Sequence, residues 1–215
     1  MQTSAMLLDL ILPLECGGCG APSTRWCPAC AGVLAAGAAD PRLVTPRLDP
    51  GVAVLSLGRY AAARRQAIVA VKEHGRTDLI APLAGALRTG LARLLDWGLL
   101  DVPVAVVPAP TRRMAARRRG GDPVTRVALA ATADLAGITV VPALRLTGFA
   151  RDSVGLSSAD RQRNLAGRVR LTRPVTGPAV VVDDVVTTGA TACESVRALQ
   201  TAGVEVHAVL ALADA

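Results

Sequence analysis

Short runs of consecutive apolar residues alternate along this chain with longer segments in which apolar residues recur every three or four positions. The runs predict buried strands and the longer segments predict helices, because helical spacing places the recurring apolar residues on one face. Predicted strands cover 52–57, 104–107, 139–141, 179–182 and 204–212, and predicted helices cover 61–73, 79–97, 122–137 and 191–201. Apolar strands that alternate with helices are typical of a parallel sheet covered on both faces, so we predict an α/β fold.

The length and composition agree with a folded chain of this kind. The 215 residues allow one ordinary domain and a small additional module, and 51% of them are hydrophobic, which excludes a disordered protein. No apolar run reaches the roughly 18 residues that a membrane span needs. The apolar run at 6–12 has no basic residue before it, as an export signal would, so we expect a cytoplasmic protein. The sequence leaves the oligomeric state open.

Four of the five cysteines form two Cys-x2-Cys pairs, Cys16 with Cys19 and Cys27 with Cys30. Two-residue spacing lets both thiolates of one turn reach the same ion, and two such turns complete a tetrahedral site of four sulfurs. In a chain without an export signal, this spacing favours a structural Zn²⁺ site over disulfides. A redox pair, or cysteines with no shared chemistry, would be the alternative.

Prolines separate the cysteine pairs from the first predicted strand. Pro41, Pro46 and Pro50 stand among few apolar residues, a composition typical of a linker. We therefore expect an N-terminal helix and zinc-binding module over 1–37, a linker over 38–51 and an α/β domain over 52–215.

The segment 179–191 carries the most specific chemical pattern. An apolar strand ends in Asp183 and Asp184, and three threonines and Gly189 follow at the start of the next helix. Ligands of parallel sheets bind beyond the C-terminal ends of the strands, and the free N–H groups of a helix N-terminus favour phosphate. Carboxylates repel phosphate but accept hydrogen bonds from ribose hydroxyls, so this order of residues predicts a site for a ribose 5-phosphate. Alternatively, the aspartates only cap the helix.

All 13 residues of this segment resemble the phosphoribosyl-pyrophosphate-binding motif of type I phosphoribosyltransferases. The chain around it resembles the ComF family, the competence protein F group of amidophosphoribosyltransferase-like proteins. The matching residues, in that family's order, are the two cysteine pairs, Tyr60, Arg65, Ile68, Lys72, Gly75, Val107-Pro108-Ala109-Pro110, Arg112, Arg118-Arg119-Gly120, Gly155-Leu156, Arg161 and Asn164. The resemblance implies a type I phosphoribosyltransferase-like (Rossmann-like) parallel sheet flanked by helices, with an N-terminal double zinc ribbon.

The resemblance also implies a ligand and a set of site residues. The ligand is phosphoribosyl pyrophosphate with Mg²⁺, and the reaction is transfer of the phosphoribosyl group to or from a nitrogen acceptor. Asp183 and Asp184 are the implied catalytic residues, which act through the ribose hydroxyls. The implied substrate-binding residues are Val185, Val186, Thr187, Thr188, Gly189, Ala190, Thr191, Lys72, Arg112, Arg113, Arg161 and Asn164. Residues 145–170 resemble the mobile loop that closes over the substrate.

Two departures from the family pattern leave the acceptor unidentified. Gly121-Asp122-Pro123 stands where the family usually has Phe-Asn-Gln, and Ser153 stands where it has Gln. The resemblance therefore assigns no contact with a base or a partner to these positions.

Basic residues are concentrated in two segments of a chain with net charge +7. Residues 112–119 contain five arginines and no acid, and residues 145–173 contain seven arginines and two aspartates. Such localisation favours bound phosphate over a uniformly basic surface, with a solvated turn as the alternative for the first segment.

A second hypothesis follows from the ComF family's association with uptake of transforming DNA. In it the protein is not an enzyme but binds single-stranded DNA or DNA-uptake proteins, through the outer arginines Arg117, Arg118 and Arg119. Aromatic residues make up only 2% of the chain, so such DNA binding would be mainly electrostatic.

Overall fold

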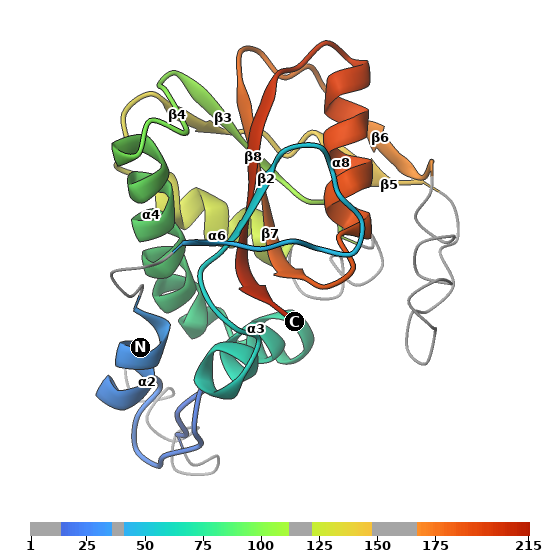
Figure 1. Ribbon diagram of the computed structural model, residues 1–215. Helices are drawn as coiled ribbons and strands as arrows, with labels where there is room; N and C mark the ends of the chain where they lie inside the picture. Colours follow the sequence, from blue (N-terminus) through green and yellow to red (C-terminus); the bar gives the residue numbers. More distant parts are fainter. Residues whose placement is uncertain (1–13, 36–40, 112–121, 148–166) are drawn as a thin grey trace, which may run out of the picture.

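The structure is a computed structural model that describes residues 14–35, 41–111, 122–147 and 167–215 (Figure 1). A six-stranded sheet has the order β1-β2-β8-β7-β3-β4. Neighbouring strands are parallel, except that β1 is antiparallel to β2 at one edge. The strands are β1 (Arg42–Leu43), β2 (Ala53–Ser56), β3 (Val104–Pro108), β4 (Ile138–Val140), β7 (Ala179–Val186) and β8 (Val206–Asp214). The predicted mixed α/β fold with a mostly parallel sheet is confirmed.

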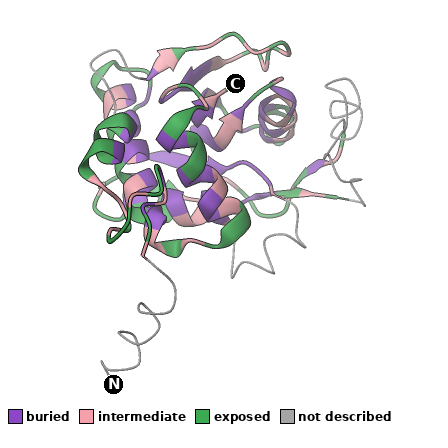
Figure 2. Ribbon diagram, turned by 90° about the horizontal axis from the view of Figure 1, so that it is seen from below, coloured by how far each residue is buried: buried purple, intermediate pink, exposed green. Residues whose placement is uncertain are grey.

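Helices cover both faces of the sheet, as the apolar strands require. The helices of the α/β part are α3 (Ala62–His74), α4 (Ile80–Asp96), α6 (Pro123–Thr132) and α8 (Ala190–Thr201), with a short 3-10 helix at Thr77–Leu79. One buried cluster joins α3, α4 and α6 to one face, and another joins α8 to the opposite face (Figure 1). The strands are buried on both faces because successive side chains alternate: Val180 and Val182 belong to the first cluster, Val181 to the second. Figure 2 shows the buried residues gathered on the sheet and on the inner sides of the helices.

The largest differences from the predicted element boundaries are in α6, β7 and β8. Helix α6 ends at Thr132, before the predicted end at Gly137, and β8 begins at Val206 instead of Val204. Strand β7 continues past residue 182 to Val186, because the polar pair Asp183-Asp184 keeps extended backbone and pairs with β8. Apolarity therefore underestimates the length of this strand.

The ends of the predicted mobile loop form two short strands. Strand β5 (Leu144–Leu146) is antiparallel to β6 (Val169–Leu171). Leu144 and Val169 are buried in the second cluster, whereas Arg145 and Arg170 are exposed and stand directly opposite each other. The alternation of apolar and basic residues explains the pairing. The middle of the loop, with Ser153, Arg161 and Asn164, lies outside the described residues.

The chain before β2 contacts the α/β part at several points. Helix α2 (Pro28–Leu34) lies in the predicted cysteine module, and its last residue, Leu34, is buried in the first cluster. In the predicted linker, Arg42 donates two hydrogen bonds to the Asp214 carboxylate, at 2.6 and 2.8 Å. Within the described ranges, no helix has both the length and the apolar character that crossing a bilayer would take.

Candidate ligand-binding site and metal centre

The acid pair lies near the C-terminal end of β7, two residues before the strand ends. Asp183 is buried, and Asp184 is partly exposed. Asp183 Oδ1 accepts a hydrogen bond from the Asp184 N–H at 2.8 Å, and Asp184 Oδ1 accepts one from the Val185 N–H at 2.8 Å. Each carboxylate is thus oriented by the backbone of the next residue. These contacts are not helix caps, because α8 begins several residues later at Ala190.

Lys72 contacts this acid pair from the last turn of α3. Its Nζ lies 2.6 Å from Asp184 Oδ2. Burial disfavours the charged ammonium, but the charge and hydrogen bond of Asp184 and the charges of Asp183 and Glu73 together outweigh it and raise the pKa of Lys72. Lys72 is the only lysine of the chain, and the resemblance to the ComF family implies that it binds the substrate. The structure pairs it with a carboxylate, so both oxygens of Asp184 have a fixed partner.

Asp183 has an environment that disfavours its charge. Burial raises its pKa well above the usual value, and the neighbouring charge of Asp184 raises it further, while Lys72 acts in the opposite direction. The pair therefore combines a carboxylate held by a lysine with a carboxyl group that retains its proton more readily. Such a combination can accept hydrogen bonds from neutral hydroxyls and also donate one.

Removing the carboxyl group of Asp183 should change the pH dependence of stability. A raised folded-state pKa means that the stability contributed by proton binding is complete below the unfolded value, about 4, and is lost as the pH rises through the folded value. We expect Asp183→Asn to melt at a higher temperature than wild type at pH 8, with the difference shrinking towards pH 4. Melting curves across this range test it, with Asp134→Asn, an exposed position, as the control. A difference that grows towards acid pH would contradict the expectation.

The segment predicted to bind phosphate connects β7 to α8. Gly189 is the N-cap residue of α8 with φ 84°, in the region that favours glycine. Thr187 is exposed, whereas Thr188 and Thr191 are partly buried. The Leu48 N–H donates to the Thr188 carbonyl at 2.9 Å, and a Cβ on Gly189 would lie 2.4 Å from the Leu48 carbonyl oxygen. Because Gly189 has no side chain, residues 46–48 of the same chain can pack closely against it.

An open hollow lies beside the Lys72–Asp184 pair. Apolar side chains from α3, α4, α6 and β8 line it: Ile68, Val71, Leu83, Pro123, Val124, Val127 and Leu212. Sequence reasoning did not find this hollow, because each of these residues has the spacing of an ordinary core position. No signal in the sequence distinguishes them.

The end of β3 borders the acid pair on its other side. The Ala109 N–H donates to the Val182 carbonyl at 2.7 Å, and Thr111 donates to Asp122 at 2.8 Å. Asp122 also caps α6 by accepting a hydrogen bond from the Thr125 N–H at 3.0 Å. Asp122 is one of the residues that differ from the ComF pattern, and here it has a structural role. The predicted site residues Arg112 and Arg113, and Arg117, Arg118 and Arg119, lie outside the described residues.

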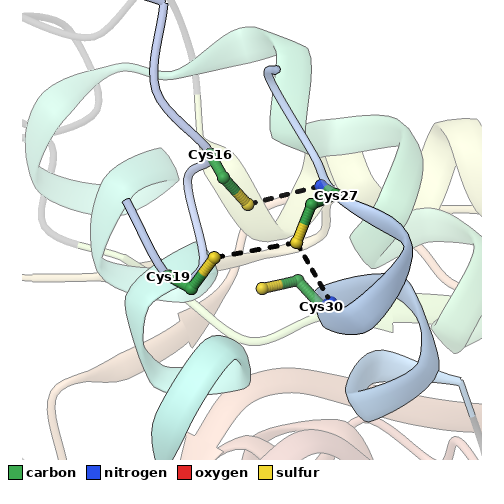
Figure 3. Close-up of side chains that lie close together, drawn as sticks. All are labelled: Cys16, Cys19, Cys27 and Cys30. Carbon is green, nitrogen blue, oxygen red and sulfur yellow. Dashed lines mark hydrogen bonds between the residues drawn. The ribbon is translucent and has the colours of Figure 1, made fainter. Parts of the chain in front are cut away.

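The four paired cysteines converge on one point, as their spacing predicts (Figure 3). Their sulfur atoms all lie within 4.8 Å of one another, and the Cys19 and Cys27 sulfurs are 3.6 Å apart. A Cβ on Gly18 would lie 2.6 Å from the Cys30 sulfur, so a larger residue at this position would displace that sulfur. This set of sulfurs can hold a metal ion and is compatible with structural zinc.

The cysteines differ in how readily they ionise. Burial disfavours the Cys16 thiolate, but hydrogen bonds from the backbone N–H groups of Cys19, Cys27 and Gly18 outweigh it and lower its pKa to about 6. Burial and the neighbouring sulfurs raise the pKa of Cys30. Without a cation, four thiolates at these distances would repel one another, so a bound metal ion would stabilise the cluster.

Comparison with known proteins adds no assignment to this geometry: neither the protein-family models nor the curated proteins include a match to the chain.

Proposed function

We propose that this protein binds phosphoribosyl pyrophosphate with Mg²⁺ beyond the C-terminal ends of β7 and β3, on a type I phosphoribosyltransferase-like fold. The observation that carries the proposal is the oriented pair Asp183-Asp184 near the end of β7, with the loop into α8 beginning after Val186. Carboxylates that can bind hydroxyls therefore lie next to a loop that can bind phosphate, and a ribose 5-phosphate needs both.

The strand order supports a ligand at this place. From β7 the chain crosses through α8 to β8 on one side, and from β3 it crosses through α6 to β4 on the other side. The two helices lie on opposite faces of the sheet. Between β7 and β3 the connections thus leave in opposite directions, and open α/β sheets bind ligands in the crevice at such a point.

The proposed roles follow from charge and position. Asp183 and Asp184 bind the ribose hydroxyls, and the loop with the N-terminus of α8 binds the 5-phosphate. Lys72 fixes Asp184 and offsets its charge, which lets an anionic ligand approach. The arginines that follow β3 in the sequence, Arg112 and Arg113, are proposed to bind the diphosphate together with Mg²⁺.

The proposed reaction is phosphoribosyl transfer. A nitrogen nucleophile forms a bond to the ribose C1 while the C1–oxygen bond breaks, and pyrophosphate leaves with the electron pair. Positive charge grows on the ribose in the transition state, and the acid pair stabilises it through the hydroxyls.

We also propose that the ion of the cysteine centre is Zn²⁺. Four sulfurs without a further position for water form a closed tetrahedral set, which is typical of structural zinc. Its contribution is then to hold residues 14–35 together.

Calorimetry with phosphoribosyl pyrophosphate and Mg²⁺ tests the ligand assignment. Hydrogen bonds to charged groups contribute about 1.5–3 kcal/mol each, so Asp183→Asn/Asp184→Asn should weaken binding at least about tenfold. The control Asp101→Asn/Asp134→Asn removes two exposed carboxylates that precede β3 and β4, and should bind as wild type does. No binding by wild type, or equal binding by wild type and the Asp183/Asp184 variant, would remove the ribose assignment.

Binding of single-stranded DNA remains the second candidate, favoured by one observation. Arg145 and Arg170 are exposed and directly opposite on β5 and β6, where like charges repel unless an anion binds between them. A DNA affinity that falls steeply with salt, and less steeply in Arg145→Ala/Arg170→Ala, would support this candidate.

A further inference from the structure

Helix α3 contacts the cysteine centre at one end and the acid pair at the other. In its first turn, Ala63 is buried against Cys16 and Cys30. In its last turn, Lys72 forms the 2.6 Å contact with Asp184. The two sites of the molecule are thus joined by one helix of 13 residues, about 20 Å long at 1.5 Å per residue.

Arg64 makes side-chain hydrogen bonds at the first end. Its side chain is buried, and it donates to the carbonyls of Val33 and Leu34, both at 3.4 Å, and to the Leu212 carbonyl at 3.1 Å. Val33 and Leu34 are the last residues of α2, whose terminal carbonyls lack partners within their own helix. A buried guanidinium without acceptors, or buried carbonyls without donors, would cost free energy. These hydrogen bonds therefore hold α2, α3 and β8 in one arrangement.

Metal ligands form the beginning of α2. Cys27 is its N-cap residue, and Cys30 lies in its first turn. An ion that draws these two sulfurs towards Cys16 and Cys19 therefore determines where α2 lies. The carbonyls at the far end of α2 then determine where Arg64 lies.

We propose that metal occupancy of the four-cysteine centre controls the orientation of Asp184 through α3, with Arg64 as the positioning residue between the two. The proposal rests on the proposed function for its biological consequence, which is ligand binding that depends on the metal. Its physical part, the coupling between the two sites, does not need the ligand. Couplings of this kind typically change an equilibrium by about 5- to 150-fold.

The Val185 amide gives a direct readout of the coupling. Its N–H donates to Asp184 Oδ1, while Lys72 holds Asp184 Oδ2. If α3 shifts, Lys72 releases the carboxylate and the Val185 amide loses protection from hydrogen exchange. We expect removal of the metal by a chelator to accelerate exchange of this amide by about 5- to 150-fold. Amides in the last turns of α8, on the opposite face, should be unaffected.

Variants at neighbouring positions separate coupling from general loosening. Arg64→Met keeps the length of the buried side chain but removes its hydrogen bonds, and it should abolish the metal dependence of Val185 exchange. Arg65→Met changes an exposed arginine one residue further, which lies over the Tyr60 ring, and should preserve it. Lys72→Met breaks the opposite end and should also abolish the dependence, which keeps the test decisive if Arg64→Met does not fold.

Failure of this inference is distinguishable from failure of the proposed function. Exchange at Val185 that is unchanged on metal removal, while residues 14–35 lose protection, would overturn the coupling. Calorimetry with phosphoribosyl pyrophosphate and Mg²⁺ on metal-loaded and metal-free protein gives the second readout. Binding equal in both forms would also overturn the coupling, whereas absence of binding in both would overturn the proposed function and leave the Val185 result to decide the coupling.

Discussion

Cys19→Ser should release the metal ion, loosen residues 14–35 and lower the melting temperature of the whole chain. Structural zinc contributes about 10–16 kcal/mol of binding free energy in small peptide modules, and most of it is lost when a sulfur ligand is replaced. The α/β part should remain folded, because its two buried clusters are built mainly from its own strands and helices. It should nevertheless melt earlier, since Leu34 and the bonds of Arg64 join the cysteine module to it.

Elemental analysis and calorimetric melting check this prediction together. Wild type purified without chelator should contain one zinc ion per chain, and Cys19→Ser none. Cys193→Ser, at the fifth cysteine on α8, is the matched control and should keep the ion. Wild type without zinc would contradict the metal assignment, and an unchanged melting temperature in Cys19→Ser would contradict the attachment of the module.

Gly189→Ala should be the most damaging glycine substitution at the candidate site. The left-handed backbone of residue 189 costs a residue with a Cβ about 1–2 kcal/mol, and φ here is 84°. In addition, the Cβ would lie 2.4 Å from the Leu48 carbonyl oxygen and 2.8 Å from the Pro46 Cβ, so residues 46–48 must move. Forced overpacking typically adds about 1–3 kcal/mol, which gives a total loss of roughly 2–5 kcal/mol.

Gly203→Ala provides the matched control for this substitution. Gly203 has φ 80°, but a Cβ there would meet no atom within 4 Å. Urea unfolding of both variants should therefore show a loss for Gly203→Ala that reflects the backbone alone, and a larger loss for Gly189→Ala. Equal losses of unfolding free energy in the two variants would mean that residues 46–48 do not pack closely against Gly189 in solution.

The contacts of the predicted linker could not be predicted from the sequence. Prolines and few apolar residues indicate an irregular linker over 38–51, and its described residues form no helix and only the two-residue strand β1. Composition, however, does not say what such a segment contacts. Val44 and Val52 pack against the second cluster, and the Leu48 N–H donates to the Thr188 carbonyl.

The sequence by itself determined the features that depend on neighbouring residues. Runs of valine and alanine predict strands such as β3, helical spacing predicts α3 and α4, and paired cysteines predict a common ion, since the relevant period or reach spans only a few residues. The position of Asp183 and Asp184 at a strand end belongs to the same group.

Only the tertiary structure decided which distant side chains meet. Lys72 pairs with Asp184 because α3 docks on the face of the sheet where β7 ends, and Arg64 is buried because α2 ends above it. The local sequence around either residue does not indicate these partners. It shows whether a helix position is apolar or polar, but the residue that it contacts in another element depends on how the elements pack. The hollow beside Lys72 arises in the same way, from side chains that α3, α4, α6 and β8 bring together.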